Sequence, residues 1–103
     1  MLVYNTTYQV NFEEAKNFVI WIHQFYIPKI MEYGAFAKPR LCKILSHHDE
    51  DSECFSLQFE VENSAILHQW YNKQGKELHE EMEKIFKDKA IGFATLLGII
   101  EES

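Results

Sequence analysis

LVYNTTYQV, at residues 2–10, is a run in which successive side chains alternate with a period of two. This period is typical of a β-strand, and the run is rich in the β-branched and aromatic residues that strands favour. One face would carry Leu2, Tyr4, Thr6, Tyr8 and Val10, and the other Val3, Asn5, Thr7 and Gln9. Because the run has no charged side chain, we expect it in the centre of a sheet rather than at an edge.

A first amphipathic helix should follow this strand. Asn11 can cap its first turn, and Glu14 stands at the spacing that completes a capping box. The apolar residues that then recur at helical spacing are Ala15, Phe18, Val19, Ile22, Phe25 and Tyr26. Pro28 lacks the N–H group that would reach the carbonyl of Gln24, so we expect the helix to kink or restart there. Gly34 suits a left-handed stop.

Three more strands are expected in the rest of the chain. Residues 36–46 and 54–61 are predicted to pair, joined by a polar connection at residues 47–53. Residues 90–100 should close the chain as the fourth strand.

A second helix should lie between the third and fourth strands. Asn63 or Ser64 can cap it. Its apolar side is formed by Leu67, Trp70, Tyr71, Leu78, Met82, Ile85 and Phe86. Gly75 interrupts this helix at a cost of about 1 kcal/mol, so we expect a bend there.

The resulting order, βαββαβ, is that of two split βαβ units and predicts an α+β, ferredoxin-like fold. Right-handed crossovers would place both helices on one face of a four-stranded antiparallel sheet, with the first and third strands central. The residues of the third strand that should meet the helices are Phe55, Leu57, Phe59 and Val61. With 103 residues, the chain has room for one domain, which we expect to span residues 1–103.

The other face of this sheet should be short of charge. It would carry Asn5, Thr7, Gln9, Ser56 and Gln58. A solvated face usually carries Lys and Glu, whereas neutral polar groups can pair with one another once they are covered. A second copy of the chain is the simplest cover, so we expect a homodimer joined through this face.

The charge of the chain argues against two kinds of partner. The formal net charge is −6, and Arg40 is the only arginine. Binding to a phosphate backbone needs clustered Lys and Arg, so we expect neither nucleic acid nor an anionic membrane as a partner.

The cysteine content and the N-terminal sequence indicate the cytoplasm. Residues 1–12 contain no hydrophobic stretch of the kind found in signal peptides. The longest apolar run, residues 18–22, is far too short to span a membrane. We interpret Cys42 and Cys54 as reduced thiols.

Two groups contain the residue types that bind metals. His47 and His48 precede several acidic residues in the predicted connection, where a solvated loop tip is the simpler interpretation. His79 and Glu83 share a helix face, but no third ligand is evident. We therefore expect no metal and no cofactor.

The chain resembles one protein family along nearly its whole length. The resemblance is carried by Trp21-Ile22, Tyr26-Ile27-Pro28, Gly34-Ala35-Phe36, Pro39-Arg40-Leu41, Ser56-Leu57-Gln58-Phe59 and Gly92-Phe93-Ala94-Thr95-Leu96-Leu97. It is similar to a bacterial domain family of unknown function in the dimeric α/β-barrel superfamily. The resemblance implies a ferredoxin-like protomer whose sheet faces that of a second copy, and it implies no activity.

Two positions depart from the family's pattern. The family has His-Ile-Pro where this chain has Tyr26-Ile27-Pro28, and Phe-Arg-Thr where it has Phe93-Ala94-Thr95. Catalytic roles are therefore not carried over to these positions. Other members of the superfamily are cofactor-independent monooxygenases, isomerases and haem-degrading enzymes, but fold alone does not transfer function.

Four residues are candidates for a ligand pocket. Trp21 and Tyr26 precede Pro28 and could wall a gap opened by a kink, or else pack in the core. His23 could supply a base or a polar anchor, or else be a packed boundary residue. Arg40 could clamp a carboxylate of a substrate or of a partner subunit, or else form a surface salt bridge.

These observations favour a small binding or regulatory module. The alternative is a cofactor-independent monooxygenase or isomerase acting on a small hydrophobic molecule between the first helix and the sheet. A structural interaction domain is a third possibility. The sequence leaves open whether the protein is an enzyme.

Overall fold

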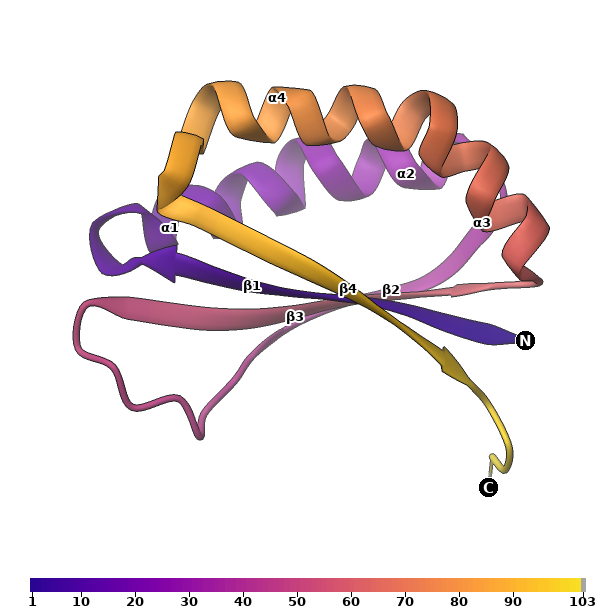
Figure 1. Cartoon of the computed structure of the whole chain (residues 1–103), viewed down its shortest axis with the longest axis horizontal. Coiled ribbons are helices and arrows are strands. Elements are labelled where there is room, and N and C mark those ends of the chain that lie inside the picture. Colours follow the sequence, from indigo (N-terminus) through magenta and orange to yellow (C-terminus); the bar gives the residue numbers. More distant parts are fainter. Residues whose placement is uncertain (103) are drawn as a thin grey trace.

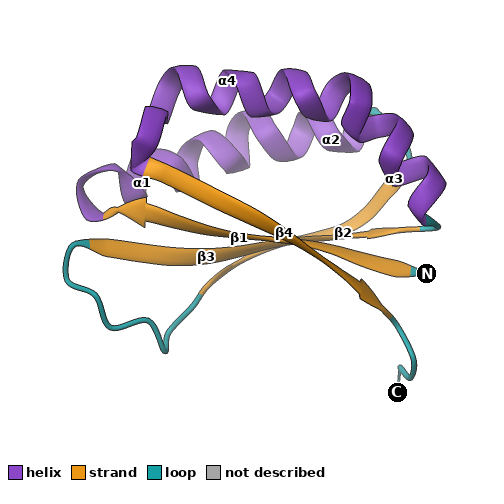
Figure 2. Ribbon diagram, viewed as in Figure 1, coloured by secondary structure: helices purple, strands orange, loops and turns teal. Residues whose placement is uncertain are grey.

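Four strands and two helical stretches follow one another in βαββαβ order in the computed structural model, which describes residues 1–102. The strands are β1 (Leu2–Asn11), β2 (Phe36–Lys43), β3 (Ser52–Val61) and β4 (Ala90–Gly98). They form one antiparallel sheet in the order β2-β3-β1-β4, with both helical stretches on the same face (Figures 1 and 2). The predicted ferredoxin-like topology is confirmed, including the central places of the first and third strands.

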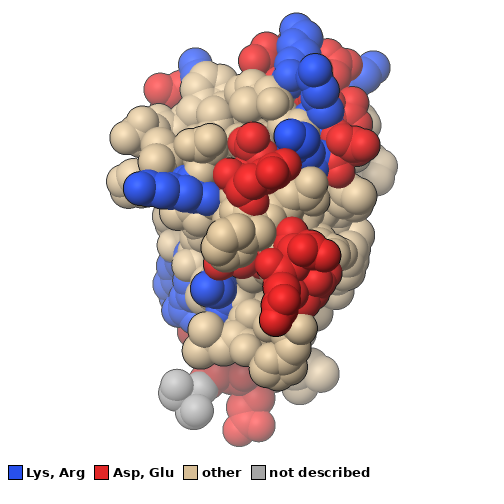
Figure 3. Space-filling view, turned by 90° about the vertical axis from the view of Figure 1, so that its left-hand side faces the viewer, with Lys and Arg blue, Asp and Glu red and all other residues tan. Residues whose placement is uncertain are grey.

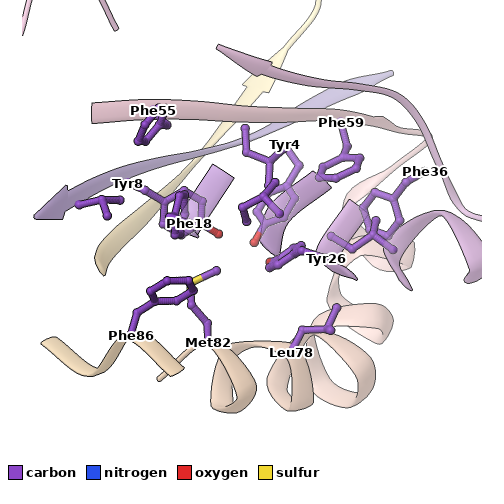
Figure 4. Close-up of a cluster of buried hydrophobic side chains, with 14 of the residues drawn as sticks. Tyr4, Tyr8, Phe18, Tyr26, Phe36, Phe55, Phe59, Leu78, Met82 and Phe86 are labelled. Atoms are coloured by element: carbon purple, nitrogen blue, oxygen red, sulfur yellow. The ribbon is translucent and has the colours of Figure 1, made fainter. Parts of the chain in front are cut away.

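The core lies between the sheet and the helices. Along β1, alternate side chains from Tyr4 to Val10 are buried against the helices, as the period of two predicts. The third strand contributes Phe55, Leu57, Phe59 and Val61, all buried as expected. The helical stretches contribute Phe18, Leu78, Met82 and Phe86 (Figure 4), together with Ile22, Ile30 and Trp70.

The first helical stretch begins differently from the prediction. Asn11 makes no capping hydrogen bond with its side chain, so the predicted capping box is wrong. Asn11 is instead the last residue of β1 and pairs with Ser52. The next backbone N–H, that of Phe12, donates to the carbonyl of Asp51 at 2.8 Å, which continues the strand pairing beyond β1.

The interruption predicted at Pro28 takes the form of a wide helical turn. Helix α1 (Phe12–Trp21) passes through a π-helical turn at Ile22–Tyr26 into α2 (Ile27–Glu32). Pro28 lies in the first turn of α2, where its missing N–H is least costly. Gly34 has φ +85°, so the expected left-handed stop is confirmed.

The second helical stretch is capped as predicted. Helix α3 (Ser64–Trp70) begins after Asn63, whose Oδ1 accepts a hydrogen bond from the N–H of Ile66 at 3.0 Å. A π-helical turn at Tyr71–Gly75 leads into α4 (Lys76–Phe86), which ends in a 3-10 turn at Lys87–Lys89.

Gly75 is required by packing. A Cβ atom at this position would lie 2.9 Å from Cζ3 of Trp70. Trp70 is only 1% exposed, and its Nε1 donates to Oε1 of Gln74 at 2.8 Å. The glycine therefore makes room for the buried indole.

Strand boundaries differ from the predicted ones by two or three residues. The second strand ends at Lys43 instead of Ser46, and the third begins at Ser52 instead of Cys54. The fourth ends at Gly98 instead of Ile100.

The β2–β3 register shifts between Ala37 and Arg40. Pro39 lies inside this shift and has no N–H to donate to the ladder, which explains the irregularity. Among residues 1–102, no helix is both long enough and apolar enough to cross a membrane.

Candidate functional site

A pocket of about 370 Å³ lies between the second helical stretch and the β1–β4 side of the sheet. Its walls come from Trp70 to Glu83 on the helical side and from Ala90 to Ala94 on β4. Tyr4, Thr6 and Tyr8 of β1 contribute to the lining, together with Tyr26. The pocket is therefore lined by residues from both halves of the chain.

The pocket exists because the first half of β4 presents small residues to the helices, whereas Leu96, which pairs with Tyr4, is a large residue further along the same face. Gly92 pairs with Tyr8, and Ala94 with Thr6, so both lie on the inner face of the sheet. Neither can reach across to α4. A Cβ atom on Gly92 would lie 2.6 Å from the ring of Tyr8, so this ring occupies the space directly over the glycine.

Three buried tyrosines face this space. Tyr4 and Tyr8 come from β1, and Tyr26 comes from the π-helical turn of the first helical stretch. Figure 4 shows their hydroxyl oxygens turned toward a common region on the side of the sheet where Met82 lies. We call Tyr4, Thr6, Tyr8 and Tyr26 the hydroxyl floor.

Burial keeps the tyrosines of the hydroxyl floor protonated. Burial raises the pKa of Tyr8 to about 12, and hydrogen bonding with Tyr26 and Thr6 offsets part of this effect. Burial also raises the pKa of Tyr26 well above its ordinary value. The pKa of Tyr4 is raised by burial and partly lowered again by a hydrogen bond with Thr6. Near neutral pH these groups are uncharged hydrogen-bond donors.

Charged residues lie around the mouth of the pocket. Nε2 of His79 lies 3.3 Å from Oε1 of Glu83, and both side chains are exposed. Lys87 and Asp88 also contribute to the lining. The mouth therefore carries both signs of charge.

The four predicted pocket residues are spread over the molecule. Tyr26 lies in the pocket wall. Trp21 is half-buried outside this wall, with its ring centroid 5.5 Å from that of Tyr26 and 5.8 Å from that of Phe86. His23 and Arg40 are exposed and lie outside the pocket lining.

The pocket is formed mainly by the second helical stretch, whereas the gap was expected beside the first. Sequence reasoning assigned Tyr4 and Tyr8 to the inner face but not to a site. The alternation of small and large residues at Gly92-Phe93-Ala94 is the signal that could have located the pocket.

The outer face of the sheet, which lies opposite the helices, carries the residues predicted for the dimer contact. Asn5 pairs with Gln58, and Thr7 with Ser56, so these side chains lie together. Ser56 Oγ donates a short hydrogen bond to Asn5 Oδ1, and Asn5 Nδ2 donates to Thr7 Oγ1 at 3.3 Å. Gln9 donates separately to Ser52 Oγ at 3.2 Å. Neutral groups on this face thus satisfy one another.

An apolar stripe borders these polar groups. Ile91, Phe93 and Leu97 lie on the outer face of β4 and are 64%, 65% and 43% exposed. Phe93 pairs with Thr7, which places the stripe directly beside the neutral polar groups. Exposed apolar residues grouped on one face in this way often mark a contact surface.

The β2–β3 connection is largely exposed, as predicted for a solvated tip, but hydrogen bonds tie it to β3. Ser52 is buried, and its Oγ donates to Oδ2 of Asp49 at 3.0 Å. That hydroxyl has one proton, so Nε2 of His47, 2.9 Å from Ser52 Oγ, must be the donor in their contact. Nδ1 of His47 lies 3.4 Å from the thiol sulfur of Cys54.

This hydrogen-bonded chain anchors the connection. Burial, together with the charge of Asp49, raises the pKa of the Cys54 thiol, which therefore stays protonated and weakly nucleophilic. The pKa of Asp49 is lowered by hydrogen bonds from the backbone of Asp51 and from Ser52. Within residues 1–102, no three His, Cys, Asp or Glu side chains are grouped so as to hold a metal ion.

Charged side chains are mixed on the end of the molecule shown in Figure 3. Basic and acidic groups lie among uncharged residues there, without a broad basic surface. This face offers no electrostatic track for a nucleic acid.

Comparisons with known proteins agree with the fold. The sequence matches, over residues 1–100, the model of a family described as "Domain of unknown function (DUF4286)". The crystal structure of a dimeric ferredoxin-like protein from an uncultured marine organism is similar, with a TM-score of 0.72 and 12% sequence identity. The match covers 99% of this chain and 97% of that one. No curated protein sequence matches significantly.

Proposed function

The chain belongs to the DUF4286 family, and we propose that it is a homodimeric module that binds a small, mainly apolar molecule. The observation that carries this proposal is the pocket between β4 and α4. A strand that only had to complete the core would place large apolar side chains toward the helices. Between Ala90 and Ala94, this strand places Gly92 and Ala94 there and turns Ile91 and Phe93 outward.

The pocket has the character of a small-molecule site. Such sites typically have volumes of about 300–1,000 Å³ and are lined mainly by apolar groups with a few placed polar ones. Here a volume of about 370 Å³ is bounded by Trp70, Met82 and Ala94, with the hydroxyl floor at one side. A molecule the size of a substituted naphthalene suits this space.

Tryptophan fluorescence and melting temperature can test binding. Trp70 lines the pocket and Trp21 does not, so Trp21→Phe leaves a single reporter at the site. 2-Acetylnaphthalene should quench this reporter and raise the melting temperature, because a ligand of the native state stabilises it.

A matched pair of variants tests where the ligand binds. Ala94→Leu should fill the pocket and abolish both responses, whereas Thr95→Leu, on the opposite face, should leave them intact. Failure of a panel of substituted naphthalenes to change either signal, or an unchanged response in Ala94→Leu, would refute the proposal.

A second copy of the chain is the partner that best fits the outer face. Interfaces combine an apolar centre with polar groups that can pair, and charged residues are depleted at their centre. The apolar stripe at Ile91, Phe93 and Leu97, beside the neutral polar groups of β1 and β3, has this composition. The similar crystallised protein is described as dimeric, which supports the same assembly for this chain.

Light scattering tests the dimer. Phe93→Glu should yield monomers, because two carboxylates would be buried at a two-fold contact. Ile85→Glu is the control, since Ile85 is an exposed apolar residue on α4. Wild-type protein that is monomeric at high concentration would exclude the homodimer.

The same features support proposals about partners and location. The net charge of −6 and the single arginine favour a small molecule and a second copy over nucleic acid. Cys42 and Cys54 are free thiols, in keeping with a cytoplasmic location.

A cofactor-independent isomerase is a second candidate, favoured by His79 at the pocket mouth. Its Nε2 lies 3.3 Å from Oε1 of Glu83, one turn further along α4. A ring nitrogen there could take a proton from a carbon between a carbonyl group and a C=C bond, while the C–H electron pair shifts to make a dienolate and the proton returns to the far carbon of the C=C bond.

Deuterium exchange can test this activity. The protein should catalyse exchange of the methyl protons of 2-acetylnaphthalene in deuterium oxide, and His79→Gln should lose this catalysis. Exchange at the buffer rate would leave binding as the function.

A further inference from the structure

The hydroxyl floor offers hydrogen-bond donors to a ligand in the pocket. Tyr4, Thr6, Tyr8 and Tyr26 bring four hydroxyl protons to one side of the pocket. Figure 4 shows the hydroxyl oxygens of Tyr4, Tyr8 and Tyr26 turned toward a common region. Each of these hydroxyl groups carries one proton, which it can donate to an acceptor on a ligand.

The occupant of the pocket should therefore offer a hydrogen-bond acceptor at its inner end. A buried donor without a partner is costly, and a purely hydrocarbon ligand would cover the hydroxyl floor without satisfying it. The body of the ligand would lie against Trp70, Met82 and the small residues Gly92 and Ala94, which favours an apolar body.

The charges around the pocket argue against an anionic acceptor. Among the described residues that line it, the one ammonium group is that of exposed Lys87. The carboxylates of Glu83 and Asp88 share the lining with it, so they offset its attraction for an anion. Burying a carboxylate away from a cation is strongly unfavourable, whereas a carbonyl oxygen pays a much smaller desolvation cost.

We infer that the pocket selects neutral ligands that combine an apolar body with a carbonyl oxygen, which accepts a hydrogen bond from the hydroxyl floor. This inference rests on the proposed binding function and specifies the ligand class. It assigns the anchoring role to Tyr8 and Tyr26.

Three probes of nearly equal shape separate the alternatives. 2-Acetylnaphthalene carries a carbonyl, 2-ethylnaphthalene lacks an acceptor, and 2-naphthoate carries a carboxylate. Calorimetric titration of the wild-type protein should show that the ketone binds about tenfold more tightly than the hydrocarbon, as one satisfied hydrogen bond allows. The carboxylate should bind more weakly than the ketone.

Variants then assign the preference to the hydroxyl floor. Tyr8→Phe and Tyr26→Phe should each lower the affinity for the ketone to near that for the hydrocarbon. Affinity for 2-ethylnaphthalene should be unchanged, which also shows that the variants fold. Tyr33→Phe, at an exposed tyrosine outside the pocket lining, is the matched control and should behave as wild type.

The outcomes distinguish this inference from the function on which it rests. Equal affinities for ketone and hydrocarbon, or tightest binding of the carboxylate, would overturn the inference while leaving a binding pocket. Absence of binding by all three probes would overturn the binding function, and the ligand class with it.

Discussion

Replacing Gly75 by alanine sets two effects of opposite sign against each other. Gly75 has φ −59° and ψ −41°, a helical conformation in which alanine is normally favoured by about 1 kcal/mol. The new Cβ would, however, lie 2.9 Å from Cζ3 of Trp70 and 3.1 Å from its Cε3 and Cη2. Overpacking of this kind costs about 1–3 kcal/mol.

The indole has little freedom to yield. Its ring packs edge-on against Phe36, with a centroid distance of 5.0 Å, and against Tyr4 at 6.0 Å. Its Nε1 is held by Gln74. We therefore expect the overpacking against Trp70 to outweigh the gain in helix propensity, so that Gly75→Ala lowers the free energy of unfolding by about 1 kcal/mol.

A double-mutant cycle makes the reasoning testable by urea denaturation followed by circular dichroism. Trp70→Phe removes the ring atoms that the new methyl group would meet. In that background, Gly75→Ala should raise the free energy of unfolding by about 1 kcal/mol, which reverses the sign and gives a coupling of about 2 kcal/mol. A stabilising effect of Gly75→Ala in the wild-type background would refute the packing argument.

Three further predictions follow from single contacts. Gly92→Ala places a Cβ 2.6 Å from the Tyr8 ring. It should therefore lower the free energy of unfolding by about 1–3 kcal/mol in urea denaturation and weaken binding of 2-acetylnaphthalene. Unchanged affinity would contradict this. Asn63→Ala removes the acceptor for the N–H of Ile66 and should cost about 1 kcal/mol, whereas a neutral effect would mean that the cap contributes little. Because the pKa of Tyr8 rises from 10.0 to about 12 on folding, its phenol form stabilises the fold below pH 10. That contribution should be lost as the pH rises from 10 through 12, and Tyr8→Phe should show a smaller loss over that range in urea midpoints.

The strand faces could be predicted from the sequence because their geometry is local. A period of two assigns Tyr4, Thr6 and Tyr8 to one side and Asn5 and Thr7 to the other, whatever the rest of the chain does. The cap at Asn63 is local in the same sense. The predicted cap at Asn11 failed because a distant contact intervened: pairing with Ser52 extends the strand through Asn11.

The pocket depends on distances between elements that are far apart in the sequence. The alternation of Gly92, Phe93 and Ala94 is visible in the sequence, but the face that meets the helices is set by pairing with β1. The space itself depends on how far α4 stands from β4. Pro28 led to the prediction of a gap beside the first helical stretch. The wide π-helical turn before Pro28 instead places Tyr26 in the wall of a pocket that lies beside the second helical stretch.

Both surfaces of β4 depend on the same alternation of side chains along the strand. Insertion of one residue before Ile91 would turn every following side chain to the opposite face. Phe93 would then enter the pocket, while the glycine and alanine would face outward, so the ligand site and the apolar stripe would disappear together. Substitutions can alter either surface alone, but a one-residue insertion or deletion at the start of β4 changes both, so the length of the chain there should be far less tolerant of change than its composition.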